Sequence, residues 1–70
     1  MTLDDRIFIL QKTIGLTPDL RRQLMLADIA HLNDRDSDAK TIVMEIEKAC
    51  TDQGIEIFSL TNYPLYGRMV

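Results

Sequence analysis

Apolar residues recur at three- and four-residue spacing along residues 37–53, and this periodicity constrains the fold more than any other feature of the sequence. The apolar positions are Ala39, Ile42, Val43, Ile46, Ala49 and Cys50. Charged residues fill the positions between them, as in a helix that packs one face on a core and exposes the other to water. Asp36 or Ser37 can cap the start, and Gly54 stands at the usual stop position. We therefore expect a helix over 37–53.

A second helix is predicted over residues 18–32. Thr17-Pro18-Asp19 places a capping hydroxyl, a proline at the first helical position and a carboxylate in the first turn. The apolar residues that follow cover more than one stripe of the helix, and polar surface is limited. Such a helix is expected to be buried on two sides.

The first segment, residues 3–14, has apolar residues at helical spacing after a possible cap at Thr2, and Gly15 ends it. Asp4 and Asp5 would lie in its first turn, where the helix dipole favours negative charge. The sequence predicts a helix here, and a strand over residues 6–10 is the alternative because of the β-branched and aromatic side chains.

The pattern changes after Gly54. Ile55, Ile57 and Phe58 to Leu60 are typical of a β-strand that Asn62-Tyr63-Pro64 breaks, and residues 65–70 can return as a second strand. The predicted fold class is therefore mainly α: a single domain over residues 1–70, with three helices and a C-terminal β-strand or β-hairpin over 55–70. The third helix and this C-terminal segment should pack on the middle helix.

The chain is short, and its composition predicts self-association. A core in 70 residues rarely contributes more than about 3–5 kcal/mol of folding stability unless a disulfide, a structural metal or self-association adds to it. Cys50 is the only cysteine, which excludes an internal disulfide and a cysteine-rich zinc site. The apolar content of 46% is high for so small a domain, so we expect some apolar surface to be buried against a second molecule, first of all another copy.

We expect the chain to be cytoplasmic and not an integral membrane protein. A lone thiol fits a reducing compartment, and the first residues carry Asp4 and Asp5 where a secretory signal would place positive charge. The longest apolar runs, such as Ile7 to Leu10, are far shorter than the roughly 20 residues that span a bilayer.

Four carboxylates between the second and third helices suggest a calcium site as one alternative. Asp34, Asp36, Asp38 and Glu45 fall at positions 1, 3, 5 and 12 of an EF-hand loop, so residues 34–45 resemble that motif. Position 6 requires a positive φ but is Ala39, not glycine. A loop here would also remove Ala39 from the apolar face of the third helix, so an acidic turn that starts a helix is the simpler interpretation.

The order of the elements suggests a second alternative. Thr41-Ile42-Val43, followed through Gly54 into Ile55-Glu56-Ile57, is similar to a recognition helix that leads into the wing of a winged helix-turn-helix domain. That resemblance implies a DNA-binding transcriptional regulator. The net charge of −3 and the acidic excess in residues 36–70 oppose phosphate binding, so nucleic acid is not the expected partner.

Isolated reactive side chains do not form a catalytic set in the sequence. His31, the one histidine, can be a ligand, a pH switch or a packing residue, and packing is the preferred interpretation. Cys50 lies on the apolar face of a predicted helix, where a thiol behaves as a small hydrophobe. We therefore expect no enzyme activity and no cofactor.

The function expected from the sequence is that of a small non-enzymatic, regulatory or inhibitory protein that binds a protein partner and forms a homodimer. The contact surface is expected in the C-terminal segment, together with an acidic helix face, because tyrosine and apolar side chains gather near the chain end. The candidate partner-binding residues are Phe58, Leu60, Tyr63, Leu65, Tyr66 and Met69.

Overall fold

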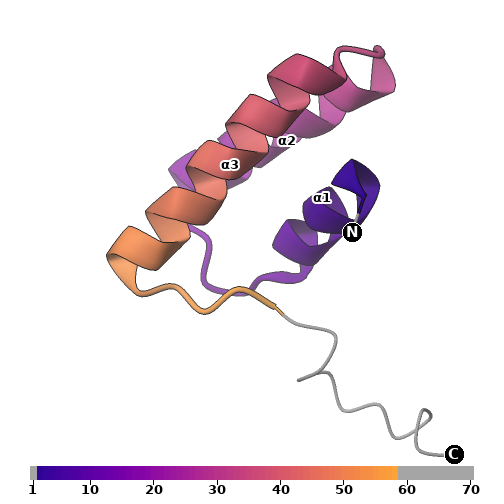
Figure 1. The fold of residues 1–70 in the computed structure, drawn as a ribbon. Helices are drawn as coiled ribbons and strands as arrows, with labels where there is room; N and C mark the ends of the chain where they lie inside the picture. The colour runs from indigo at the N-terminus through magenta and orange to yellow at the C-terminus, as the bar shows by residue number, and fades with distance from the viewer. Residues whose placement is uncertain (1, 59–70) are drawn as a thin grey trace, which may run out of the picture.

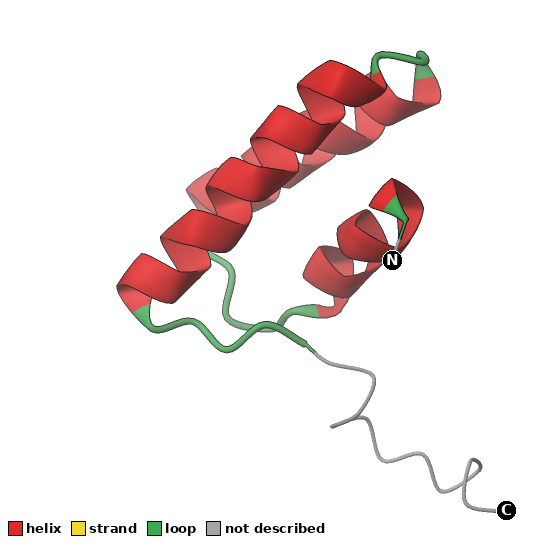
Figure 2. Cartoon of the chain, in the orientation of Figure 1, coloured by secondary structure: helices red, strands yellow, loops and turns green. Residues whose placement is uncertain are grey.

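The computed structural model describes residues 2–58, which form three helices (Figures 1 and 2). These are α1 (Leu3–Lys12), α2 (Pro18–Leu32) and α3 (Asp36–Gln53). Helices α2 and α3 lie side by side as an antiparallel hairpin, and the shorter α1 packs beside them. The mainly helical fold class is confirmed.

The first two helices begin where the sequence predicts, and their caps explain why. The Thr2 hydroxyl accepts a hydrogen bond from the Asp5 N–H at 3.1 Å, and the Asp5 carboxylate accepts one from the Thr2 N–H at 3.2 Å. This reciprocal pair is a capping box. In α2, the Thr17 hydroxyl accepts from the Leu20 N–H at 3.2 Å, and Pro18 is the first helical residue.

Helix α1 ends at Lys12, two residues before the predicted end. Thr13 has extended backbone angles, and its hydroxyl donates to the Ile9 carbonyl at 2.9 Å and accepts from the Phe58 N–H at 3.0 Å. The chain therefore leaves the helix at Thr13, which is buried. Ile14, predicted on the apolar side of the helix, is instead 90% exposed.

A tight turn joins α2 to α3. Asp34 has a positive φ of 61°, its N–H donates to the His31 carbonyl at 3.1 Å, and the Arg35 N–H donates to the Ala30 carbonyl at 2.8 Å. This pair of hydrogen bonds is the Schellman arrangement. Helix α3 then begins at Asp36 without a side-chain cap. The predicted cap by Asp36 or Ser37 is wrong, because the Asp36 carboxylate contacts His31 instead.

The hydrophobic core lies where the three helices meet. Its buried members are Ile7, Leu10, Leu16, Leu20, Leu24, Ala27, Val43, Ile46 and Cys50. Partly buried Ile55 and Ile57 pack against this cluster from the segment that follows Gly54, whose φ of 71° ends α3. The described part of that segment thus adds to the core, as Figure 1 shows by its course past the end of α1.

The predicted β-strand is not found in residues 55–58. Residues 55–58 form no strand within the part of the chain that the structure describes, and the Phe58 N–H donates to the side chain of Thr13. The remainder of the predicted hairpin, residues 59–70, lies outside the described residues.

The described helices also differ from a helix-turn-helix. In that motif the two helices cross steeply, whereas α2 and α3 run alongside each other in Figure 1. No helix within residues 2–58 combines the length and the apolar character needed to cross a bilayer.

Candidate interaction surface

Helix α2 exposes a row of large apolar side chains on the face turned away from the core. Met25 is 61% exposed, Leu26 53%, Ile29 44% and Leu32 74%. We call these four residues the α2 stripe. The core side of the same helix is buried through Leu20, Leu24, Ala27 and Ala30. The sequence predicts burial of α2 on two sides, and the structure of the single chain buries one.

The α2 stripe borders a shallow groove between α2 and α3. Leu26, Ile29 and Ala30 line it from α2, and Thr41 and Ile42 from α3. Arg35 and Asp38 stand at the end nearest the interhelical turn. The groove encloses about 440 Å³ and its lining is more apolar than polar. An apolar strip of this kind on both helices offers a continuous contact area.

Charged residues flank the two ends of this area. Arg22 lies one helical turn before Leu26, on the same side of α2, and its guanidinium is 3.4 Å from Asp19. Both side chains of that pair are exposed, so the ion pair contributes little free energy and leaves Arg22 able to contact another group. Asp38 marks the opposite end. The surface is thus apolar in the middle and carries charges of both signs at each end: Arg22 with Asp19 at one end, and Asp38 with Arg35 at the other.

The four residues of the suggested calcium loop are not arranged as a loop. Asp36, Asp38 and Glu45 lie on α3, and only Asp34 lies in the turn before it. Helical backbone over residues 36–45 separates carboxylates that an EF-hand would wrap around one ion. Within residues 2–58, no group of three or more His, Cys, Asp and Glu side chains is placed to hold a metal ion.

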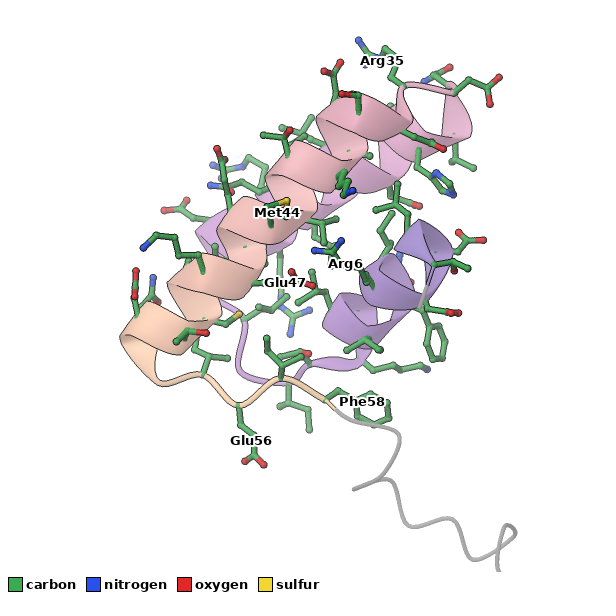
Figure 3. All side chains as sticks on the ribbon, in the orientation of Figure 1. Arg6, Arg35, Met44, Glu47, Glu56 and Phe58 are labelled. Atoms are coloured by element: carbon green, nitrogen blue, oxygen red, sulfur yellow. The ribbon has the colours of Figure 1, made fainter. Side chains whose placement is uncertain are left out.

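Of the six candidate partner-binding residues, the structure describes Phe58. It is half-buried beside the end of α1, and in Figure 3 its ring lies beyond the helices at the edge of the described chain. A groove of about 480 Å³ runs along this segment and is lined by Lys12, Ile14 and Ile55, among others. Leu60, Tyr63, Leu65, Tyr66 and Met69 lie outside the described residues.

Cys50 is fully buried in the core, as its position on the apolar face of α3 predicts. Burial raises the pKa of its thiol, and the negative charge of Glu47 raises it further. Both effects keep the sulfur protonated, which is the unreactive form.

His31 is the residue whose surroundings the sequence left open. It lies in the last turn of α2, and both ring nitrogens contact carboxylates of other helices. Its two partners are 27 and 5 residues away in the sequence, so no local pattern identifies them. The α2 stripe was also missed as a surface, although the apolar residues around most of α2 were its signal in the sequence.

Comparison with known proteins finds no matching protein family, no matching curated protein and no matching solved structure.

Proposed function

We propose that this chain is a small, non-enzymatic regulatory protein that acts through protein contacts as a homodimer, in which a second copy covers the α2 stripe. The observation that supports this proposal is the row of Met25, Leu26, Ile29 and Leu32 on the outer face of α2. Four large apolar side chains in contiguous helical positions are unusual on a monomer of this size and are typical of a contact surface.

A two-fold axis near the centre of the α2 stripe suits this surface. In an antiparallel pair of α2 helices, Leu26 of one copy would lie opposite Ile29 of the other, so these two side chains would each meet an apolar partner. The helix dipoles would also run in opposite directions, which favours the antiparallel arrangement. The same patch is then used by both copies, as a closed two-fold dimer requires.

The charges at the two ends support the second copy as the occupant. Antiparallel pairing brings the end of one copy that carries Arg22 to the end of the other that carries Asp38, so Arg22 would face Asp38 across the interface. A parallel pair would instead place Arg22 beside Arg22. The surface is therefore complementary to itself in one orientation. Such charge pairs fix how the two helices are aligned more than they add to the affinity of the dimer.

Sedimentation equilibrium of the full chain over a wide concentration range tests the dimer. The wild-type chain is expected to be dimeric, and Ile29→Glu should make it monomeric because a charge would be buried in the apolar centre. Met44→Glu is the matched control, since Met44 is a similarly exposed apolar residue on α3, outside the groove. A monomeric wild-type chain, or equal behaviour of the two variants, overturns the proposal.

A charge exchange tests the orientation. Arg22→Glu and Asp38→Arg should each weaken the dimer by placing like charges together, and the double variant should restore it. Circular dichroism of each variant checks that the helices are intact. If the double variant is as weak as the single ones, Arg22 and Asp38 do not face each other and the antiparallel register is wrong.

We further propose that a protein partner binds the C-terminal side chains, from Phe58 to Met69, that the sequence predicts as the contact surface. A chain that ends at Thr61 lacks Tyr63, Leu65, Tyr66 and Met69. It should still form the dimer, because the α2 stripe is intact. Loss of the dimer in this shorter chain would move the self-association surface to the C-terminal residues.

A further inference from the structure

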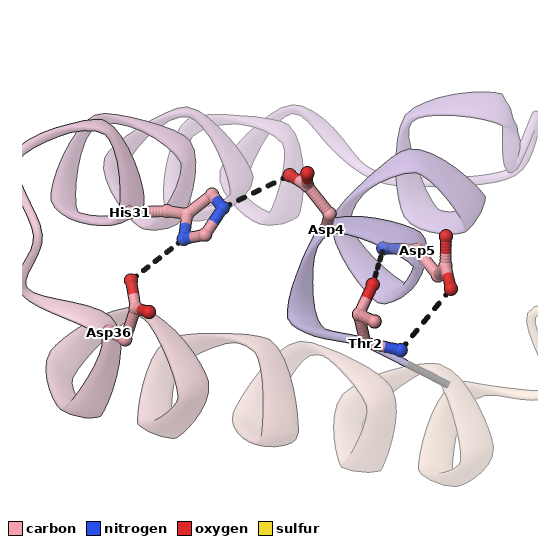
Figure 4. A network of polar contacts seen from close by, with 5 residues as sticks. All are labelled: Thr2, Asp4, Asp5, His31 and Asp36. Carbon is pink, nitrogen blue, oxygen red and sulfur yellow. Dashed lines mark hydrogen bonds and ion pairs between the residues drawn. The ribbon is translucent and has the colours of Figure 1, made fainter.

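His31 is held between carboxylates that come from the two other helices. Its Nδ1 lies 2.8 Å from an oxygen of Asp36, and its Nε2 lies 3.0 Å from an oxygen of Asp4 (Figure 4). The imidazole is 24% exposed, whereas Asp4 and Asp36 are largely exposed. One side chain thus joins the first turn of α1, the last turn of α2 and the first residue of α3.

Both contacts are hydrogen bonds only if the ring carries two protons. A neutral imidazole has one N–H donor and one acceptor nitrogen, and an ionised carboxylate accepts but does not donate. When two carboxylates face the two nitrogens, the neutral ring donates one hydrogen bond. At the other nitrogen its lone pair faces a lone pair of the carboxylate, and the two repel. The imidazolium form of His31 is therefore the one that makes both contacts hydrogen bonds.

The surrounding charges all favour that form. Asp4 from α1 and Asp36 from α3 face the ring, and within residues 2–58 they are the charged groups that pair with it. The end of α2 contributes its own carbonyl dipoles, which favour a cation in the last turn. Accordingly, the pKa of His31 is raised, first by the hydrogen bond to Asp36 and then by the charges of Asp36 and Asp4, against an opposing effect of burial.

We propose that His31 is a proton-operated clamp, which fastens the start of α1 to the α2–α3 hairpin when the imidazole is protonated and releases it when the imidazole is neutral. The neutral ring keeps one partner. Asp36 is the nearer one and is close in sequence, so the contact with Asp4 is lost. Beyond the clamp, the ion pair of Arg6 with Glu47 is the polar side-chain link between α1 and the hairpin in the described residues.

Amide hydrogen exchange and histidine NMR titration of the full chain test the clamp. Exchange protection of Ile7 and Leu10, corrected for intrinsic rates, should fall several-fold as pH rises through the His31 titration. Ile46 on α3 is the internal reference and should show no such step. In His31→Gln, which cannot titrate, the step at Ile7 and Leu10 should disappear.

Asp4→Ala is the second variant, because it removes the carboxylate on α1 and leaves the contact of His31 with Asp36. It should still show a raised His31 pKa, but α1 should be equally protected on both sides of the titration. The proposal is overturned if wild-type α1 shows no step at the His31 titration, or if His31→Gln keeps the step. Circular dichroism identifies a variant that has simply unfolded, in which case the other variant decides.

Discussion

Arg6 and Glu47, 41 residues apart in the sequence, form a two-point ion pair that ties α1 to α3. Arg6 Nε donates to Glu47 Oε2 at 3.1 Å and Nη2 donates to Oε1 at 2.6 Å. The two side chains are 22% and 34% exposed, and Figure 3 shows them pointing toward each other in the space between the two helices. A paired fork of this kind fixes both distance and orientation.

A double-mutant cycle on this pair should give a measurable coupling. Arg6→Met and Glu47→Gln are each expected to destabilise the fold, with a coupling of about 1 kcal/mol in the free energy of unfolding. The pair of Lys48 with Asp52, at 3.4 Å and with side chains 77% and 64% exposed, is the matched control. Its cycle should give a coupling of no more than about 0.5 kcal/mol, because exposed pairs are screened. Equal couplings would contradict the role of the fork.

The turn at Asp34 offers a stabilising substitution. Asp34 has a φ of 61°, a region that glycine enters without a steric penalty, so Asp34→Gly should stabilise the chain by up to about 1 kcal/mol. Gly54→Ala is the reverse control, since Gly54 has a φ of 71° and should lose about 1 kcal/mol when a Cβ is added. Urea unfolding measures both, and the slope with denaturant should not change. A destabilised Asp34→Gly would show that the carboxylate matters more than the backbone strain.

Thr13 should be the residue that fastens the segment after α3. Thr13→Val removes the hydroxyl that bonds Ile9 and Phe58, and should cost about 1–2 kcal/mol of unfolding free energy. Thr13→Ser keeps the hydroxyl and should cost less. Exchange of the Phe58 amide should quicken in the valine variant alone. If valine and serine behave alike, lost packing and not the hydrogen bonds explains the effect.

The sequence predicts the helices because their ends are set by local chemistry. The cap at Thr2, the Thr17-Pro18 start and the stop at Gly54 each act within a turn of the helix, and all three are confirmed. The predicted end of α1 is two residues too late, because the Thr13 hydroxyl accepts a hydrogen bond from the Phe58 N–H, which lies 45 residues away in the sequence. A contact at that range leaves no periodic trace in the sequence.

The non-strand course of residues 55–58 and the surroundings of His31 could not be obtained from sequence for a related reason. Alternation of Ile55 and Ile57 signals partial burial, and both are partly buried, but burial against helices gives the same pattern as burial in a sheet. Asp36 reads as a helix cap, yet its carboxylate meets His31 across the turn. The polar group that a carboxylate contacts depends on how the helices pack, and the spacing of residues in the sequence does not reveal that packing.

Cys50 should be protected from thiol reagents until the chain opens. It is fully buried and its pKa is raised by burial, so little thiolate forms at neutral pH and none is accessible. Reaction with an aromatic disulfide reagent should therefore follow the unfolding equilibrium as denaturant is added.

A Cys50→Ala, Ser37→Cys double variant gives the exposed control and should react at once, and the Cys50→Ala change alone should cost about 1 kcal/mol of unfolding free energy. The raised pKa also fixes the sign of the alkaline response: the contribution of Cys50 is complete below the thiol pKa of the unfolded chain and is lost as pH rises toward the higher folded value. Rapid labelling of the native chain at neutral pH would mean that α3 opens from the core far more readily than its packing implies.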